Sequence, residues 1–393
     1  MDRRATSTHS GASRPTAVDG LTLSRSSGLT SDGRPRHTWP DVIRALALSG
    51  VVAMNFHTYL NGSGASSPIA ASVWERLFNP NTGPLSTRFA AVFVCVAGIA
   101  IALMERSWGG ATRALSARLL RRGFVLYAAG FALEWIWPGT IIFYYGAYFM
   151  LAALLIHLTS RQLLALCAPI ALVAAVIQGV RAERLADGEY TSWLDPASIT
   201  SLTDLMVRTF VSYTHPVFPW LVFLCVGIVI GRNIDTFLHY QLRFLGLGVS
   251  LVAIAYVARD LVYHHAAEAD NAAFMLMVSS TDPKSAGVPY TVGTVGSTLV
   301  CIVVISIFSD KWSQSSVVAS LARIGQTSLT FYMFHVIFYE VVVEVFGAAS
   351  ATGLDTALVL SVICIALAST FILWWTRFIG QGPLERLYRL LAP

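Results

Sequence analysis

The sequence predicts an all-α, polytopic integral membrane protein with about ten transmembrane helices and both termini in the cytoplasm. Three observations predict this fold class. Of the 393 residues, 55% are hydrophobic and only 12% are charged, whereas soluble domains have roughly 25% charged residues. Apolar runs long enough to cross a bilayer recur along nearly the whole chain. Arginine and lysine gather at alternate ends of these runs, which is the distribution that orients membrane proteins.

The first 37 residues differ from the rest of the chain. Ser, Thr, Gly and Arg dominate them, and they have no apolar periodicity. Such a composition cannot bury enough apolar surface to fold. We expect residues 1–37 to form a disordered cytoplasmic tail and not a cleavable signal peptide, because the apolar run that follows starts too late and is too long. Residues 38–393 then form one transmembrane domain.

The apolar runs define the predicted spans in order. They cover residues 40–60, 85–105, 122–137, 140–159, 162–180, 209–231, 243–264, 288–309, 325–346 and 355–376. The third is short and ends in Trp135-Ile136-Trp137-Pro138, an interfacial aromatic belt followed by a helix-stopping proline. With the N-terminus inside, the long connections 61–84, 181–208 and 265–287 are outside. The inner connections are short and basic, apart from 106–122 and 310–324.

Polar residues occupy both ends of the first run, where a plain membrane anchor needs none. Asp41 and Arg44 are three residues apart and so share one helix face. Arg44 and His57 are thirteen residues apart, about 20 Å along a helix, which places Arg44 near the cytoplasmic boundary and Asn55 and His57 near the outer one. Polar groups in hydrocarbon generally face a cavity, a partner or a substrate path. This span is therefore the first candidate for a functional site.

This arrangement suits transfer from a cytoplasmic phosphorylated donor to an acceptor on the outer side. The fork of an arginine binds phosphate through paired hydrogen bonds, and His57 would accept the acceptor's proton at neutral pH. Asn55 would orient the acceptor or donate to an oxyanion. Taken singly, an interfacial ion pair explains Asp41 and Arg44 equally well, and an interfacial histidine explains His57.

Further candidates lie in other spans. Arg121 and Arg122 stand at the inner end of the third span, where a phosphate site and an orientation signal explain them about equally well. His215 would line an outer cavity, although an interfacial helix start explains it better. His335 lies inside the ninth span and is the second histidine candidate after His57. The segment from Gly382 to Glu385 predicts a turn and a short amphipathic cytoplasmic helix with a structural role.

Several motifs, in a consistent order, resemble those of two related membrane-protein families. Asp41-Val42-Ile43-Arg44 with Met54-Asn55 resembles the D-x-x-R-G…N opening of DUF418 proteins and of heparan-α-glucosaminide N-acetyltransferase-like proteins. Later matches are Phe93 to Gly98, Arg121-Arg122, Pro216 to Trp220, Gly227, Gly231-Arg232, Gly325 to Tyr332, and Gly382 to Arg389. Together they cover about residues 40–390.

The resemblance implies a membrane acyltransferase related to the acyltransferase-3 proteins, so residues 38–393 would be an acyltransferase-like domain. An acetyl or other acyl group would pass from cytoplasmic acyl-CoA to a hydroxyl or amine of a sugar, glycolipid or hydrophobic natural product. Acyl-CoA, with acetyl-CoA as the first candidate, is the expected co-substrate, and neither a tightly bound cofactor nor a metal is expected. We expect a multi-pass protein among the lipids of a cell membrane, in bacteria the inner or plasma membrane.

The expected roles follow from the resemblance and from the residues together. His57, Asn55 and Asp41 would be catalytic; Arg44, Arg121 and Arg122 would bind acyl-CoA; His215 and His335 would contact the acceptor. Acyltransferase-3 proteins have a histidine at the position of Asn55, and His57 is the histidine nearest to it here. Direct transfer and an acyl-histidine intermediate both remain open, as does assembly into a homo-oligomer.

Other functions fit the sequence less well. A transporter or exporter of a lipid or small solute is the main alternative, with the same polar residues lining a permeation path. A scaffold without chemistry would not need the polar residues of the first span. No basic stretch is interleaved with aromatic residues, which argues against a nucleic-acid partner. The five cysteines lie singly in apolar runs, as packing residues do.

Overall fold

The computed structural model describes residues 37–62, 73–80, 82–196, 198–266, 269–349 and 354–393. The helix bounds are α1 Trp39–Gly62, α2 Val73–Leu77, α3 Arg88–Ser107, α4 Arg113–Leu133, α5 Ile141–Leu155, α6 Ser160–Ala186, α7 Leu202–Phe210, α8 Val217–Arg232, α9 Ile234–His239, α10 Gln241–Ala266, α11 Ala272–Val278, α12 Val288–Lys311, α13 Ser316–Gln326, α14 Ser328–Tyr339, α15 Leu354–Phe378 and α16 Pro383–Leu391. Two short 3-10 helices, η1 Ser192–Leu194 and η2 Pro283–Ser285, and a π-helix, η3 Glu340–Val345, complete the set. These described ranges contain no β-strand. The tail predicted over residues 1–37 lies outside them, except for its last residue.

Six of the described helices are long and apolar enough to cross a membrane. They are α3, α6, α10, α12, the joined segment Ser328–Val345, and α15. Helices α5 and α8 are apolar but shorter. Helix α1 is 24 residues long, but its polar residues lower its hydropathy. The all-helical, multi-pass membrane protein is thus confirmed, whereas the number of ten spans and the side of each terminus stay predictions.

Two predicted spans are each divided into two helices. The prediction of one helix over 209–231 is wrong, because α7 ends at Phe210 and α8 begins at Val217. Tyr213 has a φ of 77° in the turn between them, and Pro216 supplies no N–H to continue a helix. The span predicted over 325–346 is also divided. Helix α13 ends at Gln326 and α14 begins at Ser328, so part of the connection predicted over 310–324 is helical.

The other expected spans differ from the observed helices mainly at their ends. Helix α4 begins at Arg113, nine residues before the predicted start, because the hydroxyl of Thr112 accepts a hydrogen bond from the N–H of Leu115 and caps it. Helix α6 continues to Ala186. Its start is fixed by a capping box in which Thr159 and Gln162 satisfy each other's backbone N–H groups.

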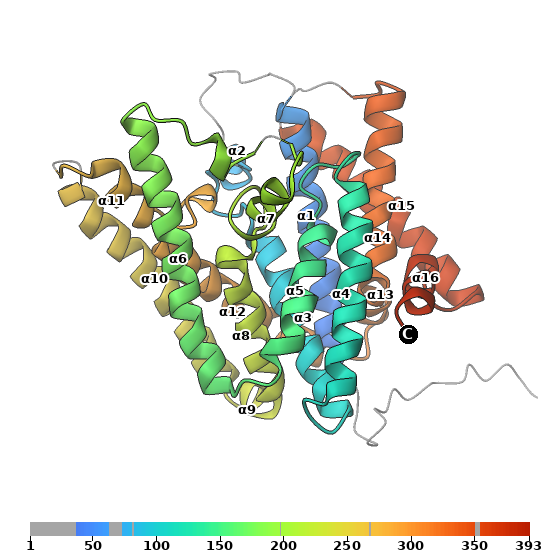
Figure 1. Ribbon diagram of the computed structural model, residues 1–393. Coiled ribbons are helices and arrows are strands. Elements are labelled where there is room, and N and C mark those ends of the chain that lie inside the picture. Colours follow the sequence, from blue (N-terminus) through green and yellow to red (C-terminus); the bar gives the residue numbers. More distant parts are fainter. Residues whose placement is uncertain (1–36, 63–72, 81, 197, 267–268, 350–353) are drawn as a thin grey trace, which may run out of the picture. The chain divides into compact units, whose positions relative to one another are not determined.

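Helix α1 occupies the middle of the helical unit (Figure 1). It packs against α3, α12, α13, α14 and α15, which come from both halves of the chain. Three further helix pairs, α4–α5, α3–α8 and α10–α12, also pack closely. Polar residues on α1 are therefore surrounded by other helices instead of facing lipid along their whole length.

Glycines set the closest of these helix contacts. A Cβ atom on Gly227 of α8 would lie 2.0 Å from the carbonyl oxygen of Cys95 on α3. A Cβ atom on Gly98 would lie 2.3 Å from the carbonyl oxygen of Leu224. Small residues that let two backbones approach are typical of helix pairs in membranes. Close helix packing therefore explains why glycine stands at positions 98 and 227, which both lie in the motifs that resemble the two families.

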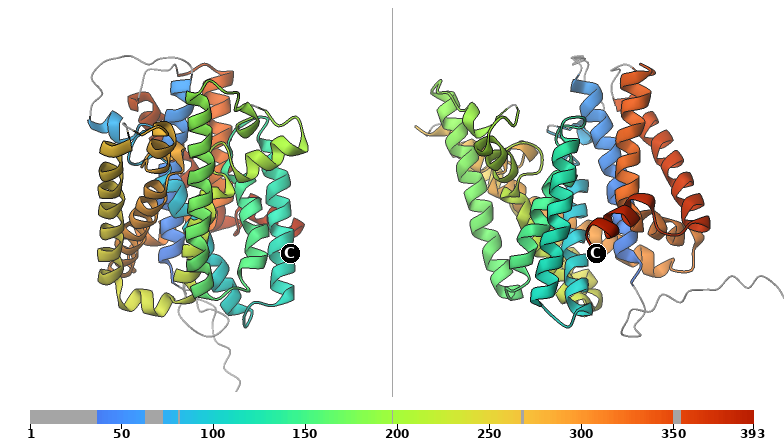
Figure 2. Two further views of the ribbon diagram at one scale, coloured as in Figure 1. Left: turned by 60° about the vertical axis from the view of Figure 1, so that its left-hand side comes forward. Right: turned by 45° about the vertical axis from the view of Figure 1, so that its right-hand side comes forward.

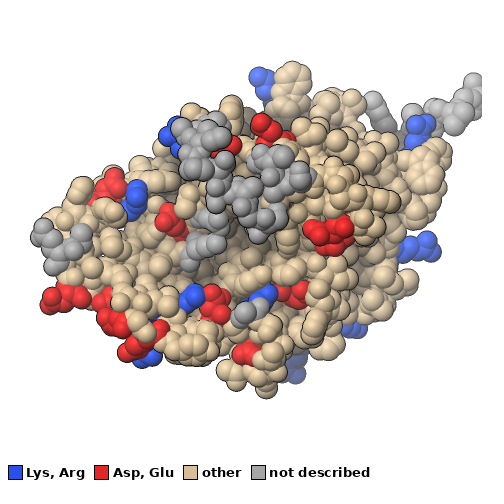
Figure 3. Space-filling view, turned by 90° about the horizontal axis from the view of Figure 1, so that it is seen from above, with Lys and Arg blue, Asp and Glu red and all other residues tan. Residues whose placement is uncertain are grey.

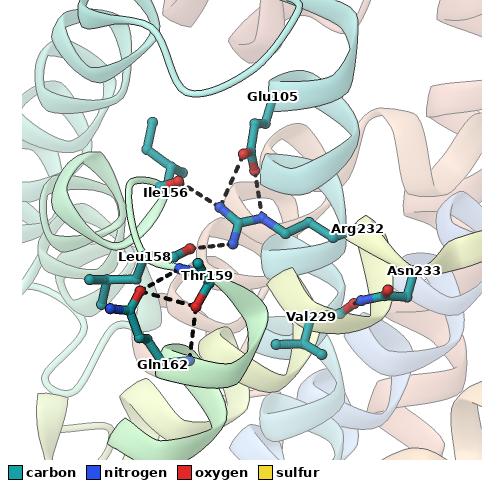
Figure 4. A network of polar contacts seen from close by, with 8 residues as sticks. All are labelled: Glu105, Ile156, Leu158, Thr159, Gln162, Val229, Arg232 and Asn233. Atoms are coloured by element: carbon teal, nitrogen blue, oxygen red, sulfur yellow. Dashed lines mark hydrogen bonds and ion pairs between the residues drawn. The ribbon is translucent and has the colours of Figure 1, made fainter.

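Arg232 holds the ends of three segments together (Figure 4). Its guanidinium, at the end of α8, binds both carboxylate oxygens of Glu105 on α3 at 2.9 and 3.0 Å. It also donates to the carbonyl groups of Ile156 and Leu158, between α5 and α6, at 2.6 and 2.5 Å. The guanidinium uses donors on both of its edges, so this one side chain links α3 and α8 to the turn between α5 and α6.

At the opposite end, where α1 terminates, Asp and Glu side chains are spread over the face with Lys and Arg between them (Figure 3). One buried ion pair belongs to the loops and helices of this end. Arg208 of α7 donates to Glu134 at 2.9 Å, with both side chains at most 6% exposed. Burial lowers the pKa of Arg208, but Glu134 more than offsets this effect, so the pKa lies above its ordinary value.

Candidate active site

The polar residues of α1 lie on different faces of the helix. Arg44 and Asn55 are eleven residues apart, which brings them to within about 20° of each other around the axis and about 16 Å along it. His57 follows Asn55 by two residues and therefore lies on the nearly opposite side. The structure thus aligns Arg44 with Asn55 and separates His57 from both.

Asn55 meets a histidine from the other end of the chain. The side-chain amide nitrogen of Asn55 lies 3.2 Å from Nε2 of His335 on α14. Nδ1 of His335 is hydrogen-bonded to the carbonyl oxygen of Tyr332. Since a carbonyl only accepts, Nδ1 carries the proton, and Nε2 is left with the lone pair that faces Asn55. His335 is fully buried, so its protein contacts fix both its orientation and its tautomer.

Aromatic rings surround this imidazole. The ring centroids of Tyr332, Trp137 and Phe56 lie 4.6, 5.5 and 6.1 Å from that of His335. The hydroxyl of Tyr332 is 3.0 Å from that of Thr140, just before α5. Three segments, from α1, the α4–α5 turn and α14, therefore form aromatic walls around His335.

His57 has a different environment. Its side chain is buried, at 5% exposure, and Glu75 of the short helix α2 acts on it electrostatically. Its position on α1 points it away from the side that Asn55 and His335 occupy. The sequence-based expectation that His57 and Asn55 act at the same point is therefore not reproduced by the helix geometry.

Asp41 and Arg44 form an ion pair at the start of α1. Nη1 of Arg44 lies 3.1 Å from Oδ1 of Asp41, and the Arg44 side chain remains 24% exposed. Oδ2 of Asp41 accepts a hydrogen bond from Gln326 of α13 at 3.0 Å. A Cβ atom on Gly325 would lie 1.8 Å from the carbonyl oxygen of Asp41. Asp41 thus joins α1 to α13 and orients Arg44, whose exposed part can still bind an anion.

Tyr145 of α5 is a neighbour of Arg44. The guanidinium of Arg44 acts electrostatically on Tyr145 of α5. The Tyr145 hydroxyl is buried and has no hydrogen-bond partner within the described ranges. A buried hydroxyl without a partner is costly, so this group can donate to or accept from a ligand that reaches it.

Arg121 and Arg122 are engaged by the last helix of the chain. Arg121 donates to the carbonyl oxygen of Pro393, and Arg122 donates to that of Ala392 at 3.4 Å. The Arg122 guanidinium also lies 5.8 Å from the ring centroid of Tyr388. Burial raises the pKa of the Tyr388 hydroxyl, against the effect of Arg122, so it stays a donor to the Arg122 carbonyl oxygen. Both arginines hold α16 on α4, and their role in acyl-CoA binding stays a prediction.

His215 lies in the turn before α8. Its carbonyl oxygen accepts a hydrogen bond from Tyr148 at 2.5 Å, and its ring lies 4.5 and 5.8 Å from those of Trp220 and Tyr144. Nδ1 has no partner among the residues that the structure describes. Its ring neighbours differ from those of His335, so the two predicted acceptor-binding histidines belong to different surroundings. Over the described residues, no three His, Cys, Asp or Glu side chains gather as a metal ion would require.

Comparison with known proteins agrees with the motifs. The family model described as "Heparan-alpha-glucosaminide N-acetyltransferase, catalytic" matches residues 36–258, more than half of the chain. The chain belongs to this family. The model described as "Protein of unknown function (DUF418)" matches residues 241–392. No curated protein matches the chain. The predicted resemblance is confirmed, and membership in the N-acetyltransferase family indicates a membrane acetyltransferase type of activity.

The Asn55–His335 contact joins the two matched parts. Asn55 lies in the part that resembles the N-acetyltransferase catalytic domain, and His335 lies in the part that resembles DUF418. Their separation of 280 residues leaves no signal in a single sequence. The role of Tyr332 was also missed, although a carbonyl group one helical turn before a histidine is a recurrent partner for its Nδ1.

Proposed function

We propose that this protein transfers an acyl group, in the first instance acetyl, from acyl-CoA to a hydroxyl or amine of a sugar, glycolipid or hydrophobic natural product at the membrane, and that His335 is its general base. The observation that carries the proposal is the Asn55–His335 pair. A buried imidazole whose Nδ1–H is bound to a carbonyl group presents an unprotonated Nε2. That is the form needed to take a proton.

In the proposed reaction, the acceptor's hydroxyl or amine replaces the Asn55 amide as the hydrogen-bond donor to Nε2 of His335, and Nε2 then takes its proton. The acceptor oxygen or nitrogen forms a bond to the thioester carbonyl carbon, and the carbon–sulfur bond breaks. The proton then passes from His335 to the sulfur of CoA, which leaves as the thiol. The amide of Asn55 donates to the carbonyl oxygen as negative charge develops on it.

Arg44 is the proposed contact for the phosphates of acyl-CoA. It is partly exposed, it is oriented by Asp41, and it lies on the same side of α1 as Asn55. The acyl end of a donor bound at Arg44 would extend along this side of the helix, past Tyr145, toward His335. The proposal replaces His57 by His335 as the base because His57 lies on the other side.

The test uses purified protein in lipid nanodiscs with acetyl-CoA as donor and glucosamine as probe acceptor, since the family name refers to a glucosaminide. Release of free CoA is followed with a thiol-reactive dye. We expect His335→Ala to lower kcat by about 100-fold or more, the range for loss of a general base. His239→Ala, an exposed histidine on α9, should leave kcat unchanged.

Two outcomes would contradict the proposal. Full activity of His335→Ala together with loss of activity in His57→Ala would return the catalytic role to His57. Absence of CoA release by the wild type with any amine or hydroxyl sugar, together with movement of a labelled solute into proteoliposomes under a proton gradient, would establish the transporter alternative.

A further inference from the structure

The helix that carries His335 begins at a break inside the protein. Helix α13 ends at Gln326 and α14 starts at Ser328, so the first N–H groups of α14 have no partner within their own helix. The positive end of the helix dipole is concentrated at the same place. These N–H groups need a hydrogen-bond acceptor, and a negatively charged one is the most favourable.

Glu385, from the last helix of the chain, supplies that acceptor. Its Oε1 accepts hydrogen bonds from the N–H groups of Leu329 and Thr330 at 2.7 and 3.0 Å. Its Oε2 accepts one from the hydroxyl of Thr330 at 2.5 Å. The carboxylate therefore caps a helix that begins more than fifty residues earlier in the sequence.

The residues around Glu385 are arranged for this contact. A Cβ atom on Gly382 would lie 2.1 Å from Oε2 of Glu385 and 2.9 Å from the Thr330 hydroxyl. Pro383 starts α16, where its missing N–H costs nothing. The Gly-Pro-x-Glu pattern thus brings a carboxylate against another helix, which is more specific than the structural turn that the sequence predicts.

Helix α16 is held at its other end as well. Tyr388 donates to the carbonyl oxygen of Arg122 at 3.2 Å, and Arg122 donates back to that of Ala392. Helix α16 accordingly bridges α4 and the start of α14, and it is visible as the short dark red helix near the C label (Figure 2). Because both ends are attached, Glu385 is a fixed acceptor and not a mobile one.

A short chain of contacts leads from Glu385 to the imidazole. Glu385 binds the N–H groups of residues 329 and 330, and the carbonyl group of Tyr332 in the same turn accepts from Nδ1 of His335. His335 is seven residues into α14, about 10 Å from its start. Loss of the cap would loosen the turn on which the tautomer and orientation of His335 depend.

We propose that Glu385 is a positioning residue for His335, acting through the first turn of α14. This inference rests on the proposed function, in which His335 is the base. It gives the C-terminal segment a part in the reaction without any contact between Glu385 and the substrate.

The experiment compares four variants with the wild type and with His335→Ala in the CoA-release assay. Glu385→Ala is expected to lower kcat at least tenfold while the KM for acetyl-CoA changes less than twofold. Glu385→Gln keeps a carbonyl oxygen for the two N–H groups, so it should retain at least half of the wild-type kcat. In the double variant Glu385→Ala/His335→Ala, no further loss beyond His335→Ala is expected, because both changes act on the same group. Asp204→Ala is the control, since Asp204 likewise accepts from a backbone N–H, that of Thr200, beside the start of a helix, α7.

Hydrogen exchange of the peptide that covers residues 326–339 provides a readout independent of activity. Glu385→Ala should speed exchange in the first turn of α14, and Asp204→Ala should not. Wild-type kcat in Glu385→Ala, or equal losses in Glu385→Ala and Asp204→Ala, would overturn the positioning role. An inactive wild type in which Glu385→Ala still speeds exchange would instead overturn the proposed function, and the positioning role with it.

Discussion

Asn55 and His57 are neighbours in the sequence, and yet α1 directs them to nearly opposite sides. A helix turns about 100° per residue, so a separation of two residues is among the least favourable for a shared site. The separation of eleven residues between Arg44 and Asn55, by contrast, is close to three full turns. At the scale of single residues, the face of the helix decides which polar groups act together.

Arg44 should be required for donor binding more than for chemistry. Loss of charge-assisted hydrogen bonds to phosphate costs about 1.5–3 kcal/mol each, so Arg44→Ala should raise the KM for acetyl-CoA about tenfold or more and change kcat less than twofold. The KM of Arg44→Lys should lie between those of the wild type and Arg44→Ala, because lysine keeps the positive charge but lacks the paired donors of the guanidinium. Steady-state kinetics of CoA release measure both constants.

Arg243→Ala is the matched control for Arg44. Arg243 lies on α10, which packs on α12, and stacks over Tyr240 at 4.6 Å. An equal rise in KM for both variants would show that overall positive charge, and not Arg44 itself, attracts the donor. Thermal unfolding of each variant separates this effect from loss of the Asp41 ion pair.

Pairs of helices depend on small residues where their backbones touch. The α3–α8 pair places Gly227 against the carbonyl group of Cys95 with no room for a side chain. Gly246, on α10, has no atom within 4 Å of an added Cβ. The same substitution should therefore have opposite effects at these two positions.

Gly227→Ala should destabilise the protein by about 1–3 kcal/mol, the range for an overpacked contact. Gly246→Ala should leave stability unchanged or raise it, since alanine favours a helix by about 1 kcal/mol over glycine. Thermal unfolding in nanodiscs, followed by circular dichroism, measures both. Equal shifts in Tm would contradict the close packing of α3 on α8.

Arg232 connects the ends of α3 and α8 with the turn between α5 and α6. Arg232→Lys should lose the two-point contact with Glu105 and at least one carbonyl contact, which we expect to cost about 2 kcal/mol. Arg106→Lys is the control at the same end of α3, because the Arg106–Asp235 pair is exposed and such pairs are worth roughly 0–1 kcal/mol. The midpoints of unfolding in denaturant compare the two variants. A similar shift for both would show that the Arg232 contacts do not hold these ends together.

Across the whole molecule, the distribution of arginine predicts which end of the bundle faces the cytoplasm. Ser313 lies in the connection between α12 and α13, predicted to be inside, and Ser198 lies before α7, predicted to be outside; both are exposed. Ser198→Cys should react with a membrane-impermeant maleimide in intact cells. Ser313→Cys should react only after the membrane is permeabilised.

The native cysteines provide the background for this labelling. None of the five is exposed, so wild-type protein should label weakly, and its signal is subtracted. Labelling of Ser313→Cys alone in intact cells would reverse the predicted orientation. Acyl-CoA would then be excluded from the Arg44 end of α1, and the proposed direction of transfer would be wrong.

The sequence by itself determined the membrane environment, the all-helical class and the family. These follow from local properties of the sequence. They are apolar runs of span length, arginines beside these runs, and motifs that occupy a short continuous stretch, such as the one from Asp41 to Asn55. It also predicted a functional site on α1, which stays a prediction. The breaks before α8 and α14 were missed, although short polar stretches, Ser212 to Pro216 and Gly325 to Ser328, mark both positions. A span predicted from the overall length and hydropathy of a run includes such short interruptions.

Only the tertiary structure decided which residues meet. Asn55 with His335, and Leu329 and Thr330 with Glu385, join positions far apart in the chain, and helix packing creates such contacts without a trace in local sequence. Residue types alone made His57 and His335 both candidates for the base. The rotation of α1 and the packing of α14 against it favour His335.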